Sequence, residues 1–213
     1  MRLRMLGAAV VVVLAAGTLT ACRTNVGFAA SVDGHSYSES DIADYVTPQA
    51  QPVQEQVSQT QTLAIPPRSY VVQTIIESRL EKLVLDALPG RGPTAGELAT
   101  IQRSILKGVS PMRFAESSGL HGYSPSFAPV YVRARTYSAL LGGVSQNAQR
   151  QGVQLDLAGI ARRVHMKIEV NPRYGRWDAQ NLYFDSSAGA TVPAFLKLKS
   201  NASATTDTQQ PVR

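Results

Sequence analysis

The most pronounced hydrophobic pattern of this chain runs from Pro67 to Leu88. Large aliphatic residues recur there at steps of three and four, which predicts an amphipathic helix with a wide apolar face. Such a helix is roughly 33 Å long, and burial of its apolar face contributes on the order of 12–24 kcal/mol before entropic costs. The other elements are therefore expected to cover this helix, unless a bound polypeptide does so. The aliphatic residues are Val71, Val72, Ile75, Ile76, Leu80, Leu83, Val84 and Leu88.

Further helices are predicted where start signals precede an apolar repeat. Ser38-x-x-Asp41 and Thr94-x-x-Glu97 resemble capping boxes, in which two side chains satisfy free backbone groups of the first turn. Proline at the first helical position marks another start, at Pro111. The predicted helices run from Ser38 to before Pro48, from Thr94 to Lys107, from Ser110 to Ser117, from Ser126 or Pro129 to Gln151, and over 157–163.

Two short strands are predicted, one at each end of the domain. Residues 28–33 lead into an Asp-Gly turn, and residues 164–170 alternate strictly between apolar and polar side chains. Because a lone strand leaves its backbone groups unpaired, the two are expected to pair with each other. The predicted fold class is therefore mainly α, a helical domain closed by a small two-stranded β-sheet that the two ends of the domain form.

Two stretches lack a periodic pattern. Residues 48–66 are rich in glutamine and proline and are predicted to be a long polar loop, disordered or functional, with a weak helical turn near 53–57. Residues 185–213 are predicted to be a small-residue linker followed by a disordered polar tail. The expected domain thus spans residues 28–184, and residues 22–27 link it to the segment before it.

Residues 1–21 have the layout of a bacterial export signal. Arg2 and Arg4 precede a short apolar run over 6–16, which is too short for a comfortable transmembrane helix. The following Leu19-Thr20-Ala21-Cys22 matches the lipobox of bacterial lipoproteins. The resemblance implies cleavage before Cys22 and transfer of a diacylglyceryl group to its sulfur. The alternative is an uncleaved signal anchor with a cysteine placed there by chance.

Cys22 is the only cysteine, so no intrachain disulfide and no cysteine-based metal site are expected. The lipid, with acyl chains such as palmitate, would anchor the protein stably to the membrane. The expected location is therefore the extracytoplasmic face of the cell membrane, with the membrane as a partner through the lipid on Cys22.

The net charge of the chain is mildly positive and gives little information about its binding partners. The full sequence carries +6, and removal of Arg2 and Arg4 leaves 19 basic and 15 acidic residues, a net charge of +4. No dense Lys/Arg block is present, so no nucleic-acid partner is expected. The mild basic bias suits anionic lipid headgroups, or it is incidental.

The chain carries no recognisable catalytic or metal-binding motif. The three histidines, His35, His121 and His165, are scattered, and neither a G-x-S-x-G elbow nor a phosphate-binding loop is present. We therefore expect no metal, no cofactor, no small-molecule substrate and no enzymatic activity.

The densest polar and aromatic cluster lies between Asn171 and Asp178. Arg173, Tyr174 and Trp177 could together hold a peptide segment. Alternatively, Tyr174 and Trp177 close the core beneath the sheet, and Asn171-Pro172 sets the turn.

The order of these motifs resembles one family of envelope proteins. A-x-V-D-G-x-x-x-S-x-x-D-I (30–42), the long helix, the second capped helix and V-N-P-R-Y-G-x-W-D (170–178) are similar to lipoproteins with a SurA N-terminal-like domain. The resemblance covers about 28–183 and implies a chaperone that holds unfolded exported polypeptides in an apolar groove. Residues 108–128 are too few for the parvulin isomerase domain of many relatives, so isomerase activity is not expected.

The predicted function is thus a lipid-anchored, chaperone-like protein that binds unfolded or exported polypeptides without catalysis. The alternative is a structural or adaptor envelope lipoprotein that binds one folded partner. If the other helices cover the long helix fully, its apolar face is ordinary core rather than a groove. The predicted peptide-binding residues are Val71, Ile75, Ile76, Leu83, Tyr174 and Trp177.

Overall fold

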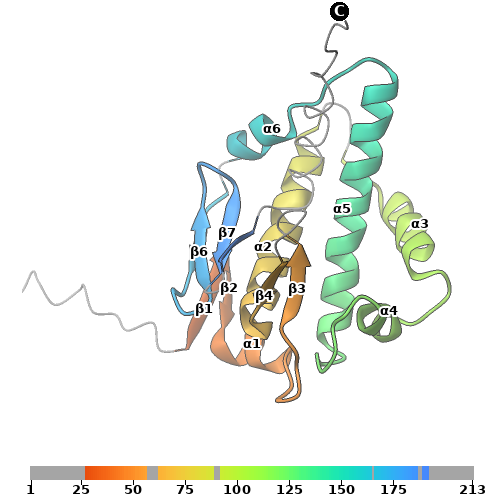
Figure 1. The fold of residues 1–213 in the computed structure, drawn as a ribbon. Helices are drawn as coiled ribbons and strands as arrows, with labels where there is room; N and C mark the ends of the chain where they lie inside the picture. Colours follow the sequence, from red (N-terminus) through yellow and green to blue (C-terminus); the bar gives the residue numbers. More distant parts are fainter. Residues whose placement is uncertain (1–26, 57–61, 89–91, 165, 187–188, 192–213) are drawn as a thin grey trace, which may run out of the picture.

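The computed structural model describes residues 27–56, 62–88, 92–164, 166–186 and 189–191. The export signal, Cys22 and the polar tail from 192 onward lie outside these residues, so the predictions for them stay predictions. The described part contains six helices and eight short strands (Figure 1).

Two long helices lie side by side at the centre of the fold (Figure 1). Helix α2 (Pro67–Asp86) is the predicted long helix and ends two residues before the predicted end. Pro67 occupies its first position, where the fixed φ angle of proline is already helical and the missing N–H would have no partner within the helix. Helix α5 (Phe127–Arg150) begins within the predicted range and covers one side of α2.

The shorter helices begin at the predicted caps. Helix α1 (Glu39–Asp44) and helix α3 (Ala95–Leu106) each start with a complete capping box, as predicted. Helix α4 (Pro111–Ser117) is capped by the Ser110 hydroxyl, and α3 and α4 both pack on α5. Helix α6 (Leu157–Arg163) packs on α2. Within the described residues, no helix is both long enough and apolar enough to span a bilayer.

The first sheet joins the two ends of the domain. Its strand order is β2-β1-β5, with β1 at Phe28–Val32, β2 at His35–Ser38 and β5 at Ile168–Val170. Val32 lies opposite Ile168 in an antiparallel register, which confirms the predicted pairing of the two ends. Strand β2, which was not predicted, adds a hairpin partner to β1.

A second sheet lies in the segment that was predicted to be a loop. Strands β3 (Val53–Gln56) and β4 (Thr62–Ile65) form an antiparallel pair, in which Val53 lies opposite Ile65. The predicted helical turn near 53–57 is wrong. Ile65 is fully buried and Val53 packs against the main core, so tertiary contacts favour strands in a glutamine-rich sequence.

A third sheet follows β5, with the order β6-β7-β8. Its strands are β6 (Gly175–Asp178), β7 (Tyr183–Ser186) and β8 (Gly189–Thr191). Strand β8 and the end of β7 occupy residues that were expected to be a linker. Gly175 adopts φ +140°, and a Cβ at this position would collide with the Asp185 carbonyl, so the start of β6 requires glycine.

The predicted fold class is therefore wrong. The described residues form a mixed α and β domain with three small, separate sheets, instead of a mainly helical domain closed by one two-stranded sheet. The error arose because the strands are only three to five residues long, too short for a period of two to be distinct.

Helix α2 is covered on more than its apolar face. Its aliphatic residues enter two core clusters, one beside β1 and α4 and the other beside α6. Polar side chains of α2 are buried as well, namely Ser69, Gln73, Thr74, Ser78 and Glu81. Glu81 is not part of the aliphatic repeat of this helix, and yet it is almost fully buried.

Candidate functional site

The structure places three of the four predicted peptide-binding residues of α2 in the core. Val71 and Ile76 are fully buried, and Ile75 is 5% exposed. All three belong to the core cluster that β1, α4 and α5 share, whereas Leu83 is half-buried nearer the other end of the helix. The arrangement matches the alternative that this face is ordinary core, because these three side chains are almost fully buried.

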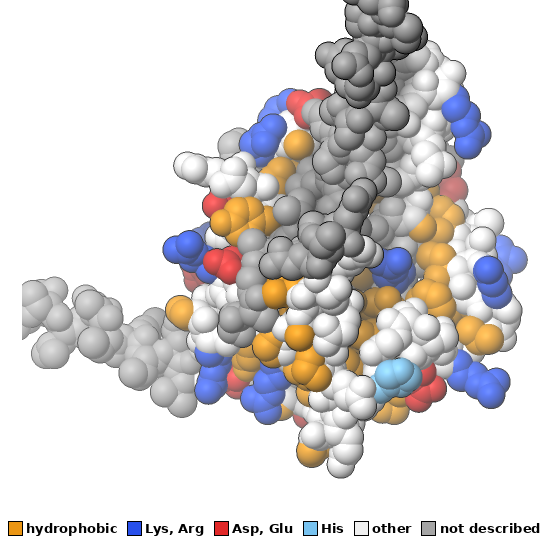
Figure 2. Space-filling view, viewed as in Figure 1, with side chains coloured by type: hydrophobic (Ala, Val, Ile, Leu, Met, Phe, Trp, Pro, Cys, Tyr) orange, Lys and Arg blue, Asp and Glu red, His pale blue; other side chains and the backbone are white. Residues whose placement is uncertain are grey.

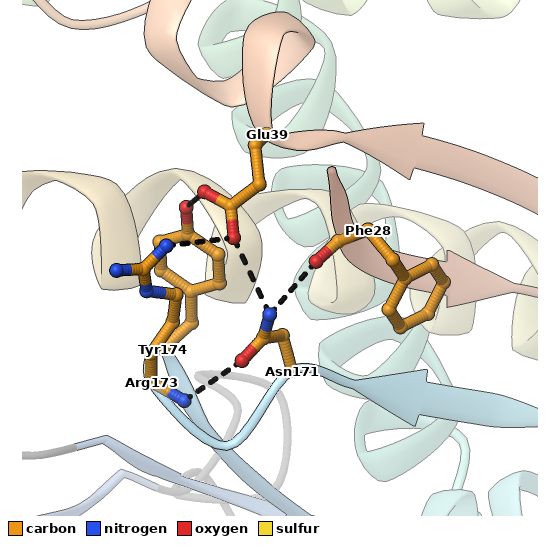
Figure 3. A network of polar contacts seen from close by, with 5 residues as sticks. All are labelled: Phe28, Glu39, Asn171, Arg173 and Tyr174. Carbon is orange, nitrogen blue, oxygen red and sulfur yellow. Dashed lines mark hydrogen bonds and ion pairs between the residues drawn. The ribbon is translucent and has the colours of Figure 1, made fainter. Parts of the chain in front are cut away.

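The turn after β5 is held by a polar network that joins three segments far apart in the sequence, namely β1, the start of α1 and the turn itself (Figure 3). The Asn171 side-chain amide donates to the Phe28 carbonyl (2.9 Å) and to the Glu39 carboxylate (3.3 Å). Its carbonyl oxygen accepts from the Arg173 backbone N–H at 3.2 Å. Asn171 thus fixes the turn against β1 and the start of α1 at the same time.

Glu39 is the acceptor at the centre of this network. Its carboxylate accepts hydrogen bonds from the Tyr174 hydroxyl and from the Arg173 guanidinium, the latter at 3.2 Å (Figure 3). Partial burial acts to raise the pKa of Glu39, but these hydrogen bonds and the charges of Arg173 and Arg68 outweigh it and lower the pKa. The carboxylate is therefore ionised at neutral pH and orients both partners.

Tyr174 and Trp177 have different environments. The Tyr174 ring is 3% exposed and packs in the main core. Burial, followed by its bond to Glu39, raises the pKa of its phenol to about 12, so the hydroxyl stays a donor. Trp177 is half-buried on β6 and bridges the two core clusters. Both residues thus contribute to the core, as the alternative prediction stated.

One edge of Tyr174 nevertheless reaches a groove, which we name the Arg173 groove. The groove encloses about 730 Å³ between the end of α1, the start of α2 and the turn after β5. Arg68 and Arg173 lie along its wall together with Tyr174, and prolines 48, 66 and 67 add rigid apolar surface. The remaining lining residues are Ala43, Val46, Thr47, Ala50 and Ser69.

The Arg173 groove suits an extended segment of polypeptide. Guanidinium groups donate strong hydrogen bonds to carbonyl and carboxylate oxygens, and rigid proline and tyrosine surfaces receive side chains at a small entropic cost. Arg173 and Tyr174 were singled out from the sequence, but Arg68 and the proline walls were missed. Only the tertiary structure could identify them, because residues 43–50, 66–69 and 173–174 are far apart in the chain.

Within the described ranges, no group of three or more His, Cys, Asp or Glu side chains is placed to hold a metal ion. His35 lies on β2 and His121 lies in the loop after α4. His165 lies outside the described residues.

Replacing Asn171 with alanine should lower the free energy of unfolding by about 1–3 kcal/mol, because the substitution leaves a β1 carbonyl and the turn without their partner. Chemical denaturation followed by circular dichroism measures this loss. Asn181→Ala is the matched control, since the Asn181 side-chain amide donates to Asp178 on the exposed surface (3.0 Å). Equal losses for the two variants would contradict a structural role for the network.

Comparison with protein-family models, with curated proteins and with solved structures found no match to this chain. The resemblance to SurA N-terminal-like lipoproteins therefore stays a prediction from the quoted motifs.

Proposed function

We propose that this chain is a lipid-anchored, extracytoplasmic binding protein that holds an extended segment of another exported polypeptide in the Arg173 groove, without catalysing a reaction. The lipobox at Cys22 supports the location, and the Arg173 groove is the observation that carries the binding role. The groove presents fixed donors beside rigid apolar walls, which is the combination that an extended chain requires.

The geometry of the Arg173 groove favours binding of fewer kinds of polypeptide than a general chaperone accepts. Promiscuous chaperone-like binding requires a broad apolar surface, and three of the four α2 residues expected to supply it are buried. Binding through the groove also fits the alternative function, an adaptor that holds one envelope partner. The two functions differ in how many unrelated polypeptides the protein accepts.

The groove can be tested with Arg68→Ala in the full chain, reconstituted in vesicles of zwitterionic lipid. Arg68 is exposed and lies at the second position of α2, so its loss should leave the fold intact. We expect at least roughly fivefold weaker binding of fluorescently labelled unfolded exported proteins, measured by anisotropy, because one charge-assisted hydrogen bond is lost. Arg113→Ala, an exposed arginine of α4, is the matched control.

The same measurement separates the two functions. Binding to several unrelated unfolded proteins supports the chaperone-like role, and binding to one envelope protein alone supports the adaptor. Binding that Arg68→Ala leaves unchanged would overturn the Arg173 groove as the site.

A further inference from the structure

A second cavity lies between α2, α5, β2 and the end of α1. It encloses about 270 Å³ and is lined by three cationic side chains, Arg79, Lys82 and Arg133. Its other lining residues are Tyr37, Tyr45, Ile75, Ser78, Val130 and Tyr137. We name it the Arg79–Arg133 pocket. It is separate from the Arg173 groove, because the two share no lining residue.

The fold brings these cations together from two helices. Ile75, Arg79 and Lys82 follow one face of α2 at steps of four and three residues, and Val130 and Arg133 follow one face of α5. Because α2 and α5 pack side by side, both faces point into the same space. The sequence pattern gave no sign of this, since the residues are about 50 positions apart.

The positive charge of the pocket is largely uncompensated. Of the carboxylates that the structure describes, none lines the pocket, and none forms an ion pair with Arg79 or Arg133. Lys82 is paired with Asp86 at 2.5 Å on the exposed side of α2, so it contributes less than the two arginines to the positive charge of the pocket. Bringing two unpaired guanidinium groups together is unfavourable unless an anion joins them.

Two acidic residues of α1 lie near the pocket without neutralising it. Asp41 accepts hydrogen bonds from the backbone and the hydroxyl of Ser38 in the capping box, both at 2.7 Å. Asp44 is exposed at the last position of α1. Burial raises the pKa of Tyr45, with smaller contributions from Tyr37 and Asp41, while the positive charge of Arg133 opposes the rise. The tyrosine therefore remains a neutral donor beside Arg133.

The pocket thus combines charged and neutral donors with apolar walls. A planar guanidinium group can donate two parallel hydrogen bonds to two oxygens of a tetrahedral phosphate, and the hydroxyls of Tyr37, Tyr45 and Ser78 can donate to its oxygens as well. Ile75 and Val130 provide an apolar surface for a carbon substituent. A volume of about 270 Å³ suits a small group rather than a peptide.

We propose that the Arg79–Arg133 pocket binds the phosphate group of a small anion, either an anionic glycerophospholipid headgroup or free phosphate. This ligand class goes beyond the polypeptide partner of the proposed function. A membrane-anchored protein would meet such headgroups at high local concentration, which makes the first source available without further transport.

The test uses the full chain in neutral detergent micelles and the double variant Arg79→Gln/Arg133→Gln. Native mass spectrometry counts the phosphatidylglycerol molecules retained from doped micelles, with phosphatidylcholine as the zwitterionic comparison. Calorimetric titration with inorganic phosphate measures the free anion. We expect one retained phosphatidylglycerol or one bound phosphate, and at least about tenfold weaker binding in the double variant.

Arg113→Gln/Arg150→Gln is the matched control, because it removes the same net charge from exposed positions of α4 and α5. Retention of phosphatidylglycerol without binding of inorganic phosphate assigns the pocket to a lipid headgroup. Binding of inorganic phosphate without retention of phosphatidylglycerol assigns it to free phosphate, and binding of both shows that the pocket recognises the phosphate group that the two ligands share. Equal weakening in the two double variants would show diffuse charge attraction and overturn the pocket. Absence of binding of either ligand to the unmodified chain would overturn it as well.

Discussion

Ile76→Asp should abolish cooperative folding of the domain. Ile76 is fully buried on α2 within the main core cluster. The substitution removes the burial of a large aliphatic side chain and requires a carboxyl group to enter an apolar environment. Together these effects cost more than roughly 4 kcal/mol, a large part of the 5–15 kcal/mol that stabilises a typical domain. Thermal unfolding followed by circular dichroism should show loss of the transition or a much lower Tm.

The matched control is Val153→Asp, which introduces the same charge at a position that is 50% exposed. This variant should unfold within a few degrees of the unmodified chain. A stable Ile76→Asp domain that had lost polypeptide binding would contradict the core assignment. Such a result would restore an open groove along α2 as the binding surface.

Glu81→Gln should stabilise the protein at alkaline pH. The Glu81 side chain is 3% exposed, and burial, with a smaller contribution from the nearby Glu77, raises the pKa of its carboxyl to about 8. A hydrogen bond with Ser138 and the charge of Arg135 oppose this rise only in part. Glutamine keeps the polar contact but removes the cost of ionising a buried group.

The expected pH dependence follows from proton linkage. Between about pH 4.5 and pH 8 the folded state keeps the Glu81 proton while the unfolded state has released it, so stability falls as the pH rises. At pH 8.5 the variant should exceed the unmodified chain by roughly 1–3 kcal/mol, and below pH 4.5 the difference should disappear. Chemical denaturation at several pH values measures both limits.

Glu116→Gln on α4 is the matched control, because Glu116 is exposed. It should change the free energy of unfolding by less than about 0.5 kcal/mol across the same pH range. Parallel curves for the Glu81→Gln variant and the unmodified chain would show that Glu81 is ionised in the folded state. The burial of Glu81 would then contribute nothing to the pH dependence.

Local signals in the sequence determined several parts of this fold. The capping boxes at Ser38 and Thr94 and the start of α4 lie where their side chains predicted, because a cap depends on residues only three positions apart. The length of α2 followed from its apolar repeat. The pairing of β1 with β5 followed from the need of each strand for a partner.

Other features depended on contacts between distant residues. Strands β3 and β4 lie in a glutamine-rich segment with weak strand propensity, and the full burial of Ile65 helps to give that segment its structure. The cross-strand pair of Trp177 with Phe184 likewise holds a sheet where a turn and a linker were expected. The adjacent aromatic residues Tyr183 and Phe184 are a local signal for strand β7.

The sequence alone thus predicted where helices begin and that the two ends of the domain meet. Helix starts depend on neighbouring residues, and the strands at the two ends pair because unpaired backbone groups need partners. Only the tertiary structure decided which face of α2 is open and whether Glu81 meets solvent. It also decided which cationic side chains share a pocket. The physical reason is that burial and charge convergence depend on side chains from segments that are remote in sequence, such as Arg79 and Arg133. The periodicity of one helix shows which residues share a face, but not what covers that face.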